Sequence, residues 1–137
     1  MCGIFYYKGD LISEEELKKA SKKISYRGPD NSKSSQIDSR NFFDFHRLSI
    51  IGNQESGNQP MTIEDYPHLS IVCNGEIYNY LELRSELEEL GHYFVTHSDT
   101  EVLVHAYLEW GEGCLKRLEG MWAFSWLDTN KKSLKIK

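Results

Sequence analysis

The chain begins with MCGIFYY (residues 1–7), which places a cysteine directly after the first methionine. This apolar and aromatic run ends at Lys8 and Gly9, a pattern that predicts a short strand at the chain terminus. Removal of Met1 would leave the Cys2 thiol a few atoms from a free α-amine, and that amine can act as its base. Unpaired cysteines are also often inert, buried hydrophobes. Position alone therefore leaves both interpretations of Cys2 open.

The composition is that of one globular domain. The 137 residues are 39% hydrophobic and 27% charged, which is enough apolar material for a core. The net charge of -5 argues against nucleic-acid or anionic-membrane partners, because both require a basic surface. No apolar stretch approaches the ~20 residues that span a bilayer, and no signal peptide is present. We therefore expect a cytoplasmic protein that binds neither nucleic acid nor membrane.

The three cysteines indicate neither a disulfide framework nor a zinc site. Cys2, Cys73 and Cys114 are widely spaced, with no CxxC pair and no histidine at metal-ligand spacing. We therefore expect no bound metal. Cys73 and Cys114 each have apolar neighbours, so we interpret both as core residues.

Strand and helix signals mix along the whole chain, without repeats or a linker. Helices are predicted over 13–24 from a capping box, over 79–91 with Asn79 as cap, and over 99–111 with Asp99 as cap. Further strands are predicted over 42–51, 69–73, 92–95, and, as a terminal hairpin, 121–128 with 133–137. Segments 27–35 and 52–60 predict loops. The class is therefore α/β or α+β in a single domain.

Several polar residues follow the predicted strands. Asn74 and Gly75 leave the buried strand 69–73 and offer a side-chain amide and an unhindered backbone N–H, the donors that a developing oxyanion needs. The same pair is common in ordinary turns. Arg47 is either a surface residue or a bidentate carboxylate clamp, and Asp99 is first of all a helix cap. No single residue decides the function.

Seven blocks, taken in order, resemble the glutaminase domain of asparagine synthetases, a class II glutamine amidotransferase domain of the N-terminal-nucleophile hydrolase type. The blocks are MCGIF (1–5), RGPD (27–30), RLSII (47–51), NQPM (58–61), CNGEIYNY (73–80), SDTEVL (98–103) and LEGMWAFSWLD (118–128). They span nearly all of residues 1–137. The resemblance implies an α+β fold, a four-layer αββα sandwich of two stacked sheets between helices, with the nucleophile at the end of a central strand.

The resemblance also implies a mechanism. Cys2 matches the nucleophile, which attacks the side-chain amide of L-glutamine to give a γ-glutamyl thioester and ammonia, after which water releases glutamate. Asn74 and Gly75 match the oxyanion hole. The implied glutamine-binding residues, which clamp the α-carboxylate, line the pocket and hold the α-amine, are Arg47, Leu48, Ser49, Ile50, Ile51, Asn74, Gly75, Glu76 and Asp99.

The resemblance implies no metal or cofactor for this step. ATP and Mg belong to a synthetase domain that this chain lacks, so the ammonia would go to a synthetase domain or subunit in trans. The family's domain continues beyond LEGMWAFSWLD with further strands, which predicts a truncated domain, incomplete at its C-terminal end. An exposed sheet edge there would invite pairing with another chain, including a homo-oligomer.

Two positions depart from the family pattern. Tyr26 stands where histidine usually precedes RGPD, and Gly52 stands where aspartate usually follows RLSII. Together with the expected truncation, they motivate an alternative hypothesis: a catalytically silent remnant that binds glutamine or a partner.

Overall fold

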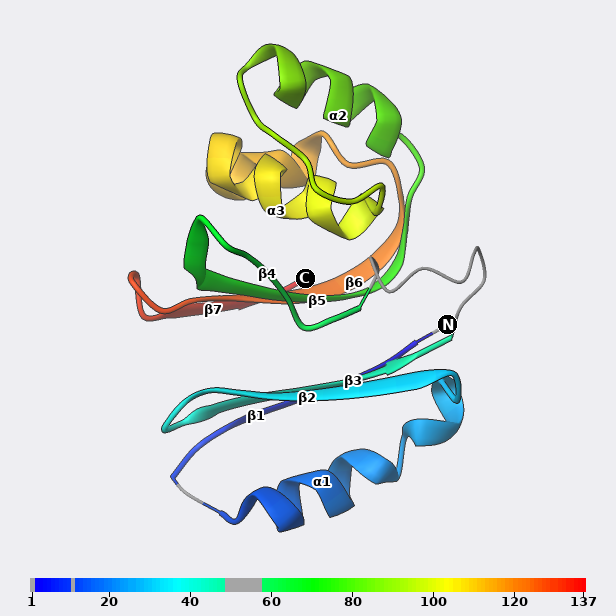
Figure 1. Cartoon of the computed structure of the whole chain (residues 1–137), viewed down its shortest axis with the longest axis vertical. Helices are drawn as coiled ribbons and strands as arrows, with labels where there is room; N and C mark the ends of the chain where they lie inside the picture. Colours follow the sequence, from blue (N-terminus) through cyan, green and yellow to red (C-terminus); the bar gives the residue numbers. More distant parts are fainter. Residues whose placement is uncertain (1, 11, 49–57) are drawn as a thin grey trace.

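The computed structural model describes residues 2–10, 12–48 and 58–137, which form four layers (Figure 1). Helix α1 (Glu14–Lys22) covers one three-stranded sheet, which stacks on a four-stranded sheet. Helices α2 (Tyr80–Glu89) and α3 (Asp99–Trp110) cover the far face of the second sheet. The predicted αββα sandwich is confirmed.

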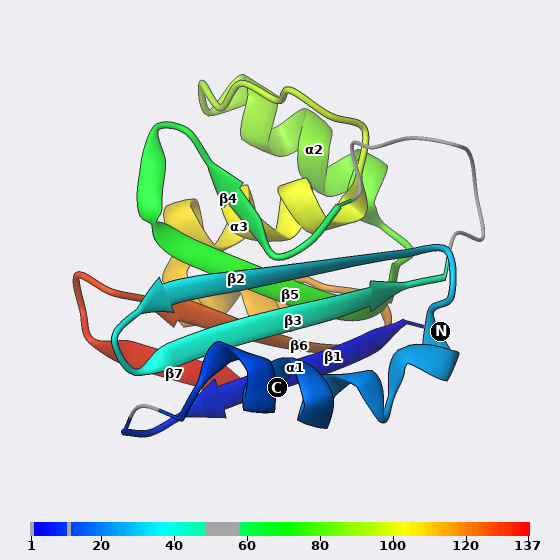
Figure 2. The ribbon, with the colours of Figure 1, turned by 60° about the horizontal axis from the view of Figure 1, so that its bottom comes forward.

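The first sheet has the order β1-β3-β2, with antiparallel pairing throughout (Figure 2). Its strands are β1 (Gly3–Lys8), β2 (Asn31–Asp38) and β3 (Asn41–Arg47). Strand β2 contradicts the loop predicted over 27–35. Its residues are mostly polar and exposed, but its backbone pairs with β3 from Asn31↔Arg47 to Asp38↔Asn41. Pairing with a buried neighbour outweighs the turn-forming composition.

The second sheet has the order β4-β5-β6-β7. Its strands are β4 (Met61–Ile63), β5 (Tyr66–Ile77), β6 (Gly120–Asp128) and β7 (Ser133–Ile136), and the predicted β6–β7 hairpin is confirmed. Strand β5 is longer than predicted. Asn74 and Gly75 lie inside it, opposite Ala123 and Trp122, so the interpretation of this pair as a turn is wrong.

The helices follow the sequence signals with two corrections, both at their first residues, and one predicted strand is absent. The capping box of Ser13 and Glu16 is present at α1. Asn79 precedes α2, but its amide bonds the backbone of residues 117 and 119 instead of capping the helix. The cap of α3 is Ser98, and Asp99 is the first helical residue. Residues 92–95 form no strand. Two short 3-10 turns, Ser25–Arg27 and Gly111–Lys116, complete the described elements.

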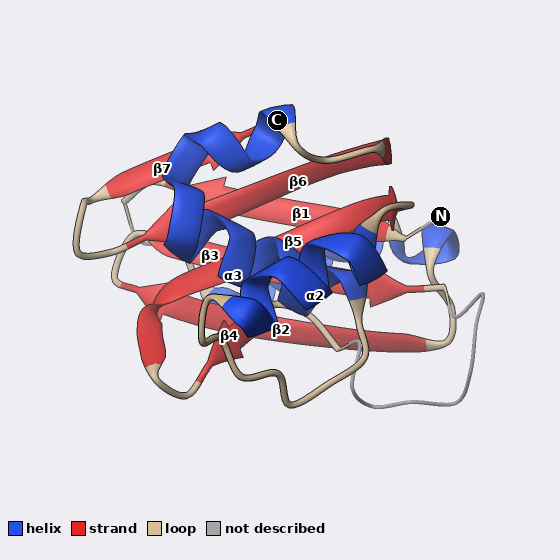
Figure 3. Cartoon of the chain, turned by 90° about the horizontal axis from the view of Figure 1, so that it is seen from above, coloured by secondary structure: helices blue, strands red, loops and turns tan. Residues whose placement is uncertain are grey.

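The main core lies between the second sheet and its two helices. In the view from above, α2 and α3 lie over this sheet (Figure 3). A smaller cluster, made by Phe43, Val72 and Leu127, joins the two sheets. The buried thiols of Cys73 and Cys114 are free, as expected for core residues. Burial raises the pKa of Cys73 to about 12 and that of Cys114 to about 11. Within the described ranges, no helix is long and apolar enough to cross a membrane.

Candidate active site

Cys2 directly precedes β1 and is half-buried. The antiparallel register pairs Gly3 with His46, which brings Cys2 beside the end of β3. There its Sγ accepts a hydrogen bond from the Leu48 N–H at 3.4 Å and lies 3.7 Å from the Leu48 carbonyl oxygen. A backbone N–H aimed at sulfur stabilises negative charge on that atom. Leu48, which the resemblance implies as a pocket-lining residue, therefore contacts Cys2 through its backbone.

The pleat decides which way these side chains point. Ile4 and Tyr6 of β1 pack against the cluster that joins the two sheets, so the even positions of β1 face the second sheet. The same alternation directs Cys2 into the space between the sheets. On β5, Val72 faces the first sheet, so Asn74 faces it too, whereas Cys73 lies in the helix-covered core. Cys2 and Asn74 therefore lie on facing sides of the two sheets.

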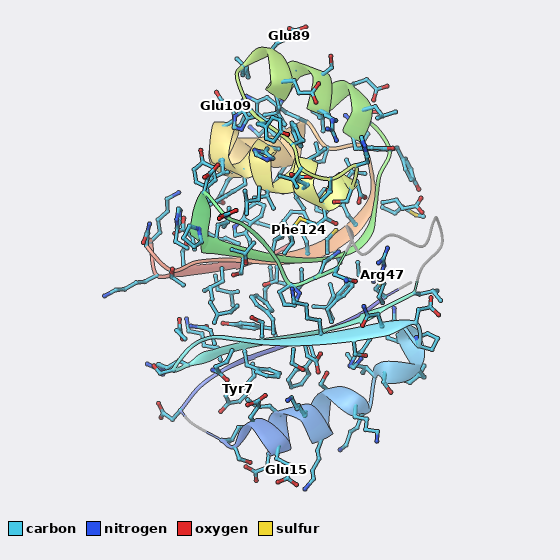
Figure 4. All side chains as sticks on the ribbon, in the orientation of Figure 1. Tyr7, Glu15, Arg47, Glu89, Glu109 and Phe124 are labelled. Atoms are coloured by element: carbon cyan, nitrogen blue, oxygen red, sulfur yellow. The ribbon has the colours of Figure 1, made fainter. Side chains whose placement is uncertain are left out.

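Arg47 is the last residue of β3 and lies at the same end of the sandwich (Figure 4). Extending the β1–β3 register by one residue places it opposite Cys2. Its Nη1 donates to Asn58 Oδ1 at 3.3 Å, and Asn31 Nδ2 donates to the same oxygen at 3.2 Å. The other predicted pocket residues on this segment, Ser49, Ile50 and Ile51, lie outside the described residues.

The RGPD block contacts the backbone of Cys2, a role that was not predicted from the sequence. Arg27 Nε donates to the Cys2 carbonyl oxygen at 3.2 Å. A Cβ on Gly28 would lie 2.1 Å from the His46 carbonyl oxygen, so only glycine fits against β3 here. The RGPD motif was visible in the sequence. A motif alone, however, does not indicate which backbone group the Arg27 guanidinium contacts.

Strand β5 has an open edge next to this end of the sandwich. Strand β4 pairs with β5 only as far as Ile71. Beyond it, the N–H of Cys73 donates to Gln59 Oε1 and the N–H of Ile77 donates to Asp99 Oδ2 at 3.1 Å. Because N–H groups alternate in direction along a strand, the N–H of Gly75 points to the same edge. No described strand pairs with it there.

Gly75 and Asn74 differ in how they are held. Gly75 has φ +153, and a Cβ would lie 2.2 Å from the Met121 carbonyl oxygen, so no larger residue fits. Asn74 is half-buried, and its Oδ1 is buried without a hydrogen-bond partner among the described residues. Unpartnered polar atoms of this kind are rare in folded proteins. Asn74 thus brings an amide whose oxygen has no partner among the described residues to the side of β5 that faces the first sheet.

The two predicted acidic residues are also at this end. Glu76 follows Gly75 and is exposed. Asp99 holds the Ile77 N–H from the start of α3. Burial is the main cause of the raised pKa of Cys73, followed by the negative charges of Asp99 and Cys2. All three groups therefore share one electrostatic neighbourhood. Among residues 2–10, 12–48 and 58–137, no three His, Cys, Asp or Glu side chains are grouped to hold a metal ion.

The chain shares its four-layer fold with an amidotransferase of known structure. A solved structure of similar fold, the glutamine phosphoribosylpyrophosphate amidotransferase from B. subtilis complexed with ADP and GMP, has a TM-score of 0.72 at 19% identity. The match covers 93% of this chain and 35% of that one. The chain belongs to the glutamine amidotransferase domain family, whose match covers residues 1–137.

The curated relatives are asparagine synthetases. Asparagine synthetase [glutamine-hydrolyzing] 1 of Bacillus subtilis (strain 168) is 48% identical over 111 residues, which are 81% of this chain and 17% of that protein. Asparagine synthetase [glutamine-hydrolyzing] 3 of the same organism is 37% identical over 142 residues, with 98% of this chain and 22% of that protein covered. The chain thus spans about a fifth of the length of these relatives.

Proposed function

We propose that this domain hydrolyses the side-chain amide of L-glutamine to glutamate and ammonia, with Cys2 as the nucleophile after removal of Met1. The observation that carries the proposal is that Cys2 and Asn74 lie on the facing sides of the two stacked sheets, beside the open edge of β5 to which the Gly75 N–H points. A thiol and two oxyanion donors are the groups that acyl transfer requires.

In the proposed first step, the α-amine of Cys2 takes the thiol proton and Sγ attacks the amide carbon of glutamine. The Leu48 N–H, 3.4 Å from Sγ, stabilises the thiolate. The Asn74 amide and the Gly75 N–H then donate to the oxygen that becomes negative, and one such donor contributes about 2.7–4 kcal/mol to the transition state. Collapse of this intermediate transfers the proton to the leaving nitrogen and expels ammonia.

In the second step, water attacks the γ-glutamyl thioester, glutamate leaves, and the Cys2 thiol is regenerated. No metal ion or cofactor enters the proposed sequence. The same donors stabilise both tetrahedral intermediates, because the oxyanion occupies the same place in each.

Substrate binding follows from charge. The Arg47 guanidinium pairs with the α-carboxylate of glutamine, because its planar fork matches a carboxylate. Glu76 and Asp99 hold the α-ammonium group. A carboxylate has about four acceptor positions, so Asp99 can keep the Ile77 N–H and still accept from a ligand. Leu48, Ser49, Ile50 and Ile51 would line the pocket beside Arg47.

The ammonia has a proposed destination. The relatives are named glutamine-hydrolyzing asparagine synthetases, and this chain covers a small part of each. We assign to it the ammonia-supplying step. A synthetase domain or subunit would use the ammonia, and ATP and Mg would act there.

The test combines intact mass with turnover. We expect a species that lacks Met1, gains one adduct from 6-diazo-5-oxonorleucine on Cys2, and releases glutamate and ammonia in equal amounts. Cys2→Ser should lose the adduct and the turnover. Cys114→Ala, which changes a buried thiol far from the site, should keep both. Glutamine binding without glutamate release would instead favour a silent binding domain.

A further inference from the structure

A side chain takes the place of a missing strand at the open edge of β5. Strand β4 stops pairing at Met61↔Ile71, which would leave the next N–H on that edge, of Cys73, without an acceptor. Gln59 Oε1 accepts it. Gln59 is 6% exposed, so its amide lies inside the protein instead of extending into water. A buried amide must satisfy both its oxygen and its nitrogen.

Hydrogen bonds link the nitrogen of the same amide to Asp99, a proposed substrate-binding residue. Gln59 Nε2 donates to Thr100 Oγ1 at 3.2 Å, and Thr100 Oγ1 donates to Asp99 Oδ1 at 3.5 Å. The other Asp99 oxygen accepts the Ile77 N–H at 3.1 Å. We call Gln59, Thr100 and Asp99 the edge bridge. It leaves β5 at Cys73 and returns to it at Ile77, so that Gly75 lies midway between its two anchors.

From this geometry we infer that Gln59 is a positioning residue for the proposed amide hydrolysis. This inference rests on the proposed function. Gln59 touches no reacting atom. It holds the edge of β5 straight on the side of Cys73, and through Thr100 it orients the Asp99 carboxylate. The Gly75 N–H and the Asp99 carboxylate are thereby set relative to each other.

The bridge needs an amide at position 59. A carboxylate cannot donate to Thr100, and a thioether such as methionine neither accepts strongly nor donates. With methionine at position 59, the Cys73 N–H would have no good acceptor, and the open edge of β5 would relax toward solvent. Misplacement of a donor by about 1 Å costs on the order of 100-fold in rate. The bridge therefore acts on two different steps, through Gly75 on catalysis and through Asp99 on binding.

Three variants separate these effects. Gln59→Met breaks both arms of the bridge and should lower kcat about 10- to 100-fold and raise KM. Thr100→Val keeps the Gln59–Cys73 bond and cuts the link to Asp99, so it should mainly raise KM. The matched control is Thr62→Val, which removes the bond between Thr62 Oγ1 and Ser70 Oγ (3.2 Å) within the paired part of β4 and β5 and leaves the edge bridge intact. It should change neither constant.

The outcome is read from the split between kcat and KM at equal amounts of folded protein. The expected split between Gln59→Met and Thr100→Val supports the positioning role. Equal, small effects in all three variants would overturn it, and so would losses that follow only the melting temperature. If Gln59→Met does not fold, the KM of Thr100→Val decides the question. A raised KM supports the positioning role, and an unchanged KM overturns it. An inactive wild-type chain would contradict the proposed function and this inference together, whereas an active chain with unaffected variants would overturn this inference alone.

Discussion

The second sheet and its helices carry polar groups at two places, which differ in how these groups are used. Around β5, the Asn74 Oδ1 and the Gly75 N–H have no partner among the described residues. Elsewhere, His92 Nδ1 lies 2.9 Å from His105 Nδ1, and His92 Nε2 lies 3.0 Å from Glu109 Oε2. We call His92, His105, Glu109 and the neighbouring Glu101 the histidine cluster. Figure 4 shows Glu109 well away from Arg47.

The histidine cluster has the features by which active sites are often recognised. It borders a cavity of about 630 Å³, between the β4–β5 turn, residues 90–95 and α3. Yet its groups mostly satisfy one another. Glu101 is buried and accepts the backbone N–H groups of Val95 at 2.7 Å and Thr96 at 2.6 Å. His105 Nε2 has no hydrogen-bond partner among the described residues and lies 3.9 Å from Glu101 Oε1.

The difference teaches that a candidate active site is better recognised by polar groups left without partners at one place than by the number of titratable groups. The histidine cluster holds a connecting segment in place, because Glu101 ties residues 95 and 96 to α3. At the end with Cys2, the Asn74 Oδ1 and the Gly75 N–H are without partners among the described residues. Four predictions test this contrast, in order of decreasing effect.

Asn74→Ala should lower kcat for glutamine hydrolysis by about 10²–10³-fold, because it removes one proposed oxyanion donor. Its melting temperature should stay near that of the wild type, since the Asn74 Oδ1 has no partner to lose. The matched change at the histidine cluster, His92→Gln, should leave kcat within about twofold of wild type. Steady-state glutamate release measures both. Equal losses in the two variants would contradict the contrast.

The histidine cluster should control stability at acid pH. Burial, with a smaller contribution from the neighbouring His92, lowers the pKa of His105 from 6.5 to about 4. The unfolded chain therefore takes up this proton first as the pH falls. The stability from neutral His105 is complete above pH 6.5 and is lost between pH 6.5 and 4, by about 3 kcal/mol.

Urea unfolding at several pH values measures this loss. His105→Phe should be less stable at neutral pH and should show a flatter dependence across that range. If the free energy of unfolding of His105→Phe depends on pH as steeply as that of the wild type, His105 is not the group responsible for the loss.

Glu101→Gln should destabilise the fold by about 1.5–3 kcal/mol, because the buried carboxylate accepts hydrogen bonds that its amide cannot all replace. Turnover per folded molecule should be unchanged. Denaturant titration beside an active-site titration with the alkylating analogue separates the two quantities. A fall in kcat at full folding would show that the cluster and the site are coupled.

The smallest effect belongs to the rim of the cluster. Glu109→Gln removes the partner of His92 Nε2 at a partly exposed position, and such pairs contribute about 0.2–1 kcal/mol. At a pH where His92 is protonated, the loss should shrink in 1 M salt, because exposed charges are screened there. Thermal unfolding at low and high salt measures it. A loss that is large and independent of salt would place this pair in the core.

Much of the fold was predictable from local sequence signals. The capping box at Ser13, the β6–β7 hairpin and the helices near 79–91 and 99–111 follow from patterns within a few residues of each other. The αββα class followed from the ordered motifs. These motifs also selected Cys2, Asn74 and Gly75 as candidate site residues, and their roles stay predictions.

Only the tertiary structure decided the rest, because those features depend on residues far apart in the chain. The polar strand β2 exists because β3 offers it a buried partner, which its own composition does not indicate. Ser98 caps α3, and Asp99 is left to hold the Ile77 N–H, 22 residues away. The open edge of β5, and with it the place of Gln59, is set by where β4 stops. The sequence alone determined which chemical groups are present; backbone pairing between distant segments determined which of them are left unpartnered beside Cys2.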